Sequence, residues 1–183
     1  MRVERQKRKK IDKDTEIIIR NNSHGMFEAP GVDSNIFLEK QNDEESVTFG
    51  ELRKLRKFLE KMDIVIAEVN SEEFTLYDIV TALRLKVYDD YFKYVLGEDE
   101  EEFESIDYIS PEAFEEFIID CDQDEFAKVL ESKLKNQVIE TSVNLYKEHR
   151  LADYTKMTLI RKTRPYEEQS EFWNDIDETI NIK

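Results

Sequence analysis

A helix start signal at Thr48–Glu51, set between stretches rich in apolar and β-branched residues, constrains the fold of this chain more than any other feature. Thr and Glu at this spacing form a capping box, in which each side chain satisfies a backbone N–H that the first helical turn leaves free. The stretches 16–20, 35–40 and 64–69 are typical of strands on which a helix can lie, and the acidic stretch 41–46 is expected to be a loop. The helix itself has one apolar stripe, formed by Leu52, Leu55, Leu59 and Met62. We therefore predict a compact ββαβ unit.

The remainder of the chain has helical patterns. A second capping signature at Thr75–Asp78 predicts a long amphipathic helix up to Gly97, and later helix starts are indicated at Ser110–Pro111, Asp122 and Asp153. The helix that starts at Asp122 is expected to run to about Arg150. The expected class is therefore α+β, with a small N-terminal ββαβ unit, a long connecting helix and a C-terminal helical bundle. The expected division is a basic N-terminal arm (1–14), an α/β unit with the long helix (15–96), an acidic linker (97–109), a helical domain (110–164) and a C-terminal tail (165–183).

Charge is unevenly distributed along the 183 residues, whose formal net charge is −16. Residues 1–13 hold seven Lys or Arg and two acidic residues, whereas residues 98–131 hold fifteen acidic residues and one Lys. A chain this acidic is repelled by nucleic acid everywhere except at its basic arm. The sequence has no apolar run of the length that a membrane span needs and no signal-peptide core at its N-terminus, so we expect no membrane contact and a cytosol-like compartment.

The residues that carry chemistry are few and scattered. His24 and His149 lie far apart in the sequence, and no Gly-rich phosphate loop follows a strand. The single cysteine, Cys121, lies between Asp120 and Asp122, which disfavour its thiolate. We therefore expect no catalytic residue, no metal, no cofactor and no enzymatic activity.

Two terminal segments are candidates for binding partners. The N-terminal arm, which we expect to lack regular structure when free, is either a docking segment for an acidic partner or a solubilising tail. The C-terminal tail carries aromatic and aliphatic side chains, and it is either a docking peptide or a segment that folds back on its own domain. The candidate partner-binding residues are Arg5, Lys7, Arg8, Lys9, Lys10, Lys13, Phe172, Trp173 and Ile176.

The order of these signals resembles a family of small structural proteins of tailed bacteriophages. The shared pattern is a strand ending in Ile19-Arg20-Asn21-Asn22-Ser23, followed by Gly25 and Phe27, by Val47-Thr48 leading into a Leu-rich helix, and by the aliphatic strand Ile64-Val65-Ile66. The helical half is similar from Glu112 to Ile160. The resemblance implies a building block of the head, collar or head–tail junction, and it carries over no catalytic residue.

The function expected from these features is that of a non-enzymatic component of a phage virion, made in the cytoplasm of the bacterial host. Its partners would be portal, capsid or neck subunits, with further copies of itself in a symmetric assembly, and DNA contact would be confined to the arm. Two alternatives stay open. The acidic segment also fits a cytosolic inhibitor that mimics DNA, and the acidic composition fits an assembly chaperone.

Overall fold

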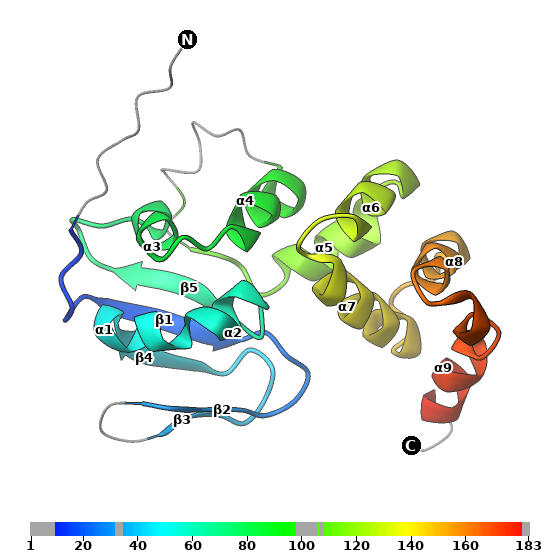
Figure 1. The fold of residues 1–183 in the computed structure, drawn as a ribbon, viewed down its shortest axis with the longest axis horizontal. Helices are drawn as coiled ribbons and strands as arrows, with labels where there is room; N and C mark the ends of the chain where they lie inside the picture. Colours follow the sequence, from blue (N-terminus) through cyan, green and yellow to red (C-terminus); the bar gives the residue numbers. More distant parts are fainter. Residues whose placement is uncertain (1–9, 32–34, 98–105, 107, 181–183) are drawn as a thin grey trace, which may run out of the picture. The chain divides into compact units, whose positions relative to one another are not determined.

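The computed structural model describes residues 10–31, 35–97, 106 and 108–180, and it confirms the predicted α+β class with a helical C-terminal region (Figure 1). The chain forms two compact units that meet in the sequence between Pro111 and Glu112. This boundary lies just beyond the expected acidic linker, most of which falls outside the described residues.

The N-terminal unit is built on a three-stranded antiparallel sheet of order β4-β1-β5, with a separate two-stranded hairpin, β2-β3. Ile17 and Ile19 on the central strand are fully buried, as are the first four residues of β5, so this part of β5 is covered on both faces. The register between β1 and β5 shifts by one residue at Ile18/Ile19, which leaves Ala67 without a residue opposite it on β1. The strands are β1 (Glu16–Asn21), β2 (Phe27–Pro30), β3 (Asn35–Leu38), β4 (Glu44–Thr48) and β5 (Ile64–Asn70).

The predicted helix after Thr48 is present, and its capping box with Glu51 forms in both directions. Its apolar stripe is buried as expected. Figure 1 shows α1 and α2 lying across the sheet, and the hairpin contacts α2 through an edge-to-face pair of Phe27 and Phe58, 5.0 Å between ring centroids. The helix is divided into α1 (Phe49–Leu52), a short 3₁₀ turn η1 (Arg53–Leu55) and α2 (Arg56–Glu60).

Two expectations for this unit are wrong. The segment 41–46, expected as an acidic loop, contains the start of β4, because backbone pairing with β1 outweighs the weak strand preference of its glutamates. The long helix expected over 76–96 is broken at Arg84, which adopts a left-handed conformation (φ 57°). The resulting elements are α3 (Leu76–Leu83), α4 (Val87–Asp90) and the π-helical turn η2 (Tyr91–Leu96).

The C-terminal unit is helical. Asp122 with Glu125 and Asp153 cap their helices as predicted, whereas the first helix begins at Ala113, two residues later than the Ser110–Pro111 signal indicated. The long helix expected from Asp122 is interrupted at Ser132, whose hydroxyl donates to Val129 O and accepts from Leu134 N–H. The helices are α5 (Ala113–Asp120), α6 (Gln123–Leu130), α7 (Lys135–Lys147), α8 (Tyr154–Lys162), the 3₁₀ turn η4 (Tyr166–Glu168) and α9 (Phe172–Ile180).

Candidate docking surfaces

The root of the N-terminal arm is fixed to the fold. Ile11 is buried, and the carbonyl oxygens of Lys13 and Thr15 accept hydrogen bonds from the N–H groups of Gly50 (2.9 Å) and Phe49 (2.8 Å). These are two of the N–H groups that the first turn of α1 leaves free, and the Thr48 hydroxyl takes that of Glu51. Residues 10–14, expected to lack regular structure together with the rest of the arm, are therefore attached to the start of α1.

The structure places only part of the predicted arm. The side chains of Lys10 and Lys13 are exposed, so both are available to a partner while the backbone beside them is held. The candidates that precede them lie outside the described residues: Arg5, Lys7, Arg8 and Lys9.

The outer face of the β2–β3 hairpin exposes large apolar side chains that the sequence did not single out. Met26 is 60% exposed and Phe37 is 52% exposed, whereas the opposite face of the hairpin is buried against the unit. A strand was predicted over 35–40, but the pattern Asn-Ile-Phe-Leu of its first four residues has apolar residues on both faces and does not indicate which face is solvated. The sequence signal for this surface is weak: the inward positions of the hairpin are all apolar, whereas its outward positions include both apolar and acidic residues.

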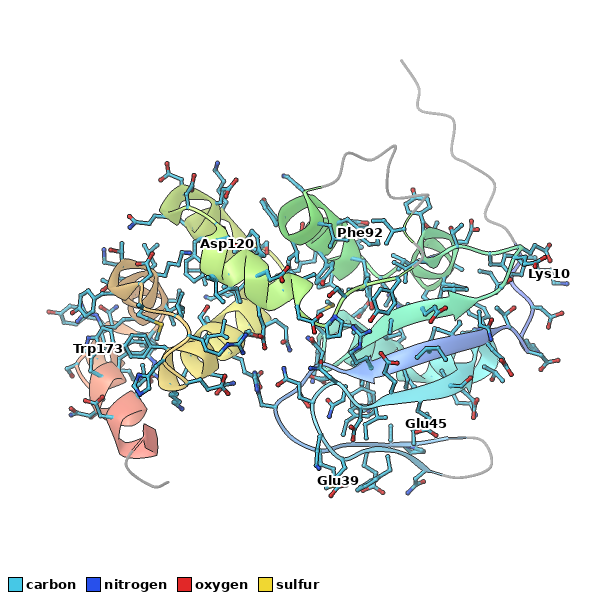
Figure 2. All side chains as sticks on the ribbon, turned by 180° about the vertical axis from the view of Figure 1, so that it is seen from behind. Lys10, Glu39, Glu45, Phe92, Asp120 and Trp173 are labelled. Atoms are coloured by element: carbon cyan, nitrogen blue, oxygen red, sulfur yellow. The ribbon has the colours of Figure 1, made fainter. Side chains whose placement is uncertain are left out.

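The C-terminal segment folds back on its own unit, one of the two alternatives that the sequence left open. Phe172 and Ile176 are buried, so in this conformation they are core residues and offer no surface to a partner. Trp173 is half-buried and stacks on Tyr154 with 4.9 Å between ring centroids and an angle of 4° between the planes. Of the three candidates in this segment, Trp173 alone contributes to the surface, and Figure 2 shows it at the end of the C-terminal unit.

A buried arginine holds three segments of the N-terminal unit together. Arg20, at the end of β1, is 2% exposed and donates through Nη1 to Ile109 O (2.7 Å) and through Nη2 to the Tyr108 hydroxyl (3.0 Å). Its Nε donates to Glu44, the residue directly opposite on β4 (2.8 Å). Tyr108 and Ile109 in turn pair with the outer edge of β5, where the Ile109 N–H donates to Ala67 O. This arginine is therefore a structural tie.

A buried lysine does similar work in the C-terminal unit. Lys156 on α8 is 2% exposed, and its Nζ donates to Ile118 O (2.8 Å) and Ile119 O (3.1 Å) at the C-terminal end of α5. A cation at this end of a helix satisfies free carbonyl groups and interacts favourably with the helix dipole. Neither buried cation was singled out in the sequence, where each is one of 27 Lys and Arg.

A polar hollow of about 490 Å³ lies beside this lysine, lined by Cys121, Asp122, Gln123, Asp124 and Asp153. Burial raises the pKa of the Cys121 thiol, and the neighbouring carboxylates of Glu125 and Asp122 raise it further, against the opposing effect of Lys156. The predicted direction of the shift is thus confirmed, but burial is a larger cause than the flanking acids. Two of the three carboxylates, Asp122 and Asp153, are engaged as helix caps.

Comparison of this chain with protein-family models, with curated proteins and with solved structures found no match. Within the described residues, no group of three or more His, Cys, Asp or Glu side chains is placed to hold a metal ion. In the same part of the chain, every helix is too short or too polar to cross a bilayer.

Proposed function

We propose that this protein is a non-enzymatic structural component of a tailed-phage virion, in the head, the collar or the head–tail connector. It acts by docking onto portal, capsid or neck subunits, with its basic arm on an acidic surface of an adjacent subunit or near packaged DNA. The setting is supported by the resemblance of the sequence pattern, and the docking mode by the charge distribution and the geometry of the arm.

The observation that carries the docking proposal is the fixed root of the arm. Because Lys13 O and Thr15 O bind the first turn of α1, the described root of the arm is held against a rigid body. A segment whose starting point is fixed loses less conformational freedom on binding than a free tail of the same length. Attachment to a symmetric assembly also supplies the high effective concentration that makes a short segment an effective ligand.

The acidic exposed surface supports the same mode. Outside the arm the chain is strongly acidic, and the carboxylates of α5 and α6 that the structure describes are mostly exposed, including Glu116, Asp120 and Asp124. Figure 2 shows Asp120 on the surface of the C-terminal unit. Complementary charge directs encounter and selects partners more than it adds affinity.

Mass spectrometry of purified particles tests the setting. The proposal expects the protein in mature particles in a stoichiometry that fits one ring or shell. Its presence only in infected-cell extracts, bound to assembly intermediates, would instead favour the assembly chaperone, and its recovery with a DNA-binding protein would favour the DNA mimic.

A second experiment tests the arm. Replacing Lys7, Arg8, Lys9 and Lys10 by Gln should reduce incorporation into particles and leave the circular dichroism spectrum unchanged. Incorporation of the unaltered protein should also weaken with added salt, because exposed charge pairs are screened over about 8–10 Å near physiological ionic strength. Wild-type incorporation of the four-Gln variant would reduce the arm to a solubilising tail.

A further inference from the structure

The outer face of the β2–β3 hairpin combines apolar and acidic side chains in an alternating arrangement. In the register of the hairpin Glu28 lies opposite Phe37, while Met26 directly precedes β2 and Glu39 directly follows β3. All four side chains are exposed, and Figure 2 shows Glu39 on the side of the hairpin that faces away from the sheet. Neighbours along one face of a strand pair lie close enough to contact one ligand. The face therefore presents two large apolar side chains, Met26 and Phe37, together with two carboxylates, Glu28 and Glu39.

This arrangement defines the chemistry of its partner. Large apolar side chains more than half exposed gain free energy from being covered, and the carboxylates beside them disfavour an acidic or purely apolar partner. A segment that alternates apolar and basic residues satisfies both requirements. The hairpin contributes its other face to the core through Phe27 and Ile36, so the outer face is free to bind such a segment without unfolding.

The N-terminus of this chain has the required composition. Residues 1–9 contain five Lys or Arg and one Glu, and their apolar residues, Met1 and Val3, alternate with Arg2. An extended segment of nine residues spans at most about 30 Å, which is long enough to cross the face of a hairpin of this size. The arm and the hairpin face are thus complementary in charge, and the first residues of the arm add two apolar side chains.

The position of the root decides which copy supplies the arm. Figure 2 shows Lys10 on the β5 side of the sheet, whereas the hairpin lies beyond β4, on the other side. Within one copy, Lys10 and the hairpin therefore lie on opposite sides of the sheet, which favours an adjacent copy as the source of the arm.

We propose that the outer face of the β2–β3 hairpin, formed by Met26, Glu28, Phe37 and Glu39, is a docking surface for residues 1–9 of a neighbouring copy of this chain. The contact is heterologous, since two different surfaces meet; its repetition between copies held in an assembly generates a ring or a filament, whereas the isolated protein forms it only weakly. The inference rests on the proposed function, in which the arm docks within a symmetric assembly, and it names the partner of that arm.

Photo-crosslinking in the full-length protein tests the inference. Phe37 is replaced by p-benzoylphenylalanine, which keeps an aromatic ring at this exposed position, and equal amounts of ¹⁴N- and ¹⁵N-labelled protein are mixed and irradiated. The expected products join position 37 of one isotopic form to residues 1–9 of the other. p-Benzoylphenylalanine in place of Met26 is a second probe of the face. The same amino acid in place of Tyr166, which is 86% exposed on the C-terminal unit, is the matched control and should give no crosslink to residues 1–9.

Charge variants test whether the crosslink depends on the carboxylates of the face, as a specific contact requires and a random collision does not. Glu28→Lys with Glu39→Lys should lower the yield of the inter-copy product about tenfold, because the reversed charges repel the basic arm. The same double reversal at Glu167 and Glu168, exposed on the turn η4, is the control, and it should leave the yield at Phe37 within about twofold of the parent.

Every outcome bears on the inference. Products that join position 37 to the arm of the same copy, products with any other segment, or no product with residues 1–9 at high protein concentration would each overturn it. Failure of the proposed function is recognised separately, because absence of the protein from purified particles would contradict the virion setting and leave an arm-to-hairpin crosslink unchanged.

Discussion

Replacing Arg20 by Met should destabilise the N-terminal unit by about 3 kcal/mol. The variant loses hydrogen bonds of a charged donor to Ile109 O and to the Tyr108 hydroxyl, and each bond to a charged group is worth about 1.5–3 kcal/mol. The ion pair with Glu44 adds little, since its carboxylate is 43% exposed and regains water when the arginine is removed. The methionine chain replaces part of the lost packing, which keeps the total near the lower end of the sum.

The assay is urea unfolding, monitored by two probes. A loss of about 3 kcal/mol corresponds to a midpoint shift of roughly 1–3 M urea for a small protein, against a total stability of about 5–15 kcal/mol. Amide hydrogen exchange at Ile109 should accelerate because its segment loses its tie to β1. The fluorescence of Trp173, the single tryptophan, reports on the C-terminal unit and should change little.

Arg56→Met is the matched control. Its guanidinium pairs with Glu60 one helical turn away, and both side chains are nearly half exposed, so the expected cost is no more than about 0.5 kcal/mol. Equal unfolding midpoints for the Arg20 and Arg56 variants would refute the assignment of Arg20 as a structural tie. Unchanged hydrogen exchange at Ile109 in the Arg20 variant would refute the inference that Arg20 holds the segment of Tyr108 and Ile109 against the edge of β5.

Four further expectations concern the core, the arm, pH and self-association. Leu83→Asp should unfold the N-terminal unit, because it places a carboxylate without a partner at a buried position of α3, at a cost of several kcal/mol; a melting curve like that of the parent would contradict this orientation of the helix. Deleting residues 2–9 should leave the thermal midpoint unchanged. Deleting residues 2–13 should lower the free energy of unfolding by about 2–4 kcal/mol, because it also removes the buried Ile11 and the Lys13 carbonyl that binds Gly50 N–H. Equal midpoints for the two deletions would show that the root is not fixed. Burial raises the pKa of the Tyr88 phenol in the folded state well above the ordinary value of 10.0. The contribution of Tyr88 to stability is therefore complete below pH 10 and is lost as the pH rises further, because only the unfolded state then releases the proton. Equal urea midpoints at pH 9 and pH 11 would contradict this. Sedimentation of the isolated protein at moderate salt should show a monomer or a weak oligomer, because its surface is strongly acidic, and a tight, large ring would count against that expectation.

Sequence and structure agree best where the determining contacts are local. The capping boxes at Thr48, Thr75 and Asp122 and the cap at Asp153 all form, because each joins a side chain to a backbone group two or three residues away. The buried stripe of α1 and α2 follows from spacing on a single helix. The α+β class and a helical C-terminal half depend on the same kind of information.

The candidate surfaces were only partly predictable. The basic composition of the arm is visible in the sequence, but the attachment of its root to Gly50 depends on an element more than thirty residues away. The docking role proposed for Phe172 and Ile176 rested on their apolar character, which is equally the character of core residues, and their burial in the C-terminal unit is decided by packing that the tail sequence does not specify.

The sequence alone therefore determined where the helices with side-chain caps begin, which residues form the main apolar stripe and where opposite charges concentrate. Tertiary structure decided where the helices break, as at Arg84 and Ser132, and made a strand of the acidic residues of β4. It also selected Arg20 and Lys156 for burial and turned Phe37 outward. The physical reason is the range of the interactions: caps and stripes depend on residues within one or two helical turns, whereas strand pairing, buried cations and the solvated face of a hairpin depend on partners that only the folded chain brings together.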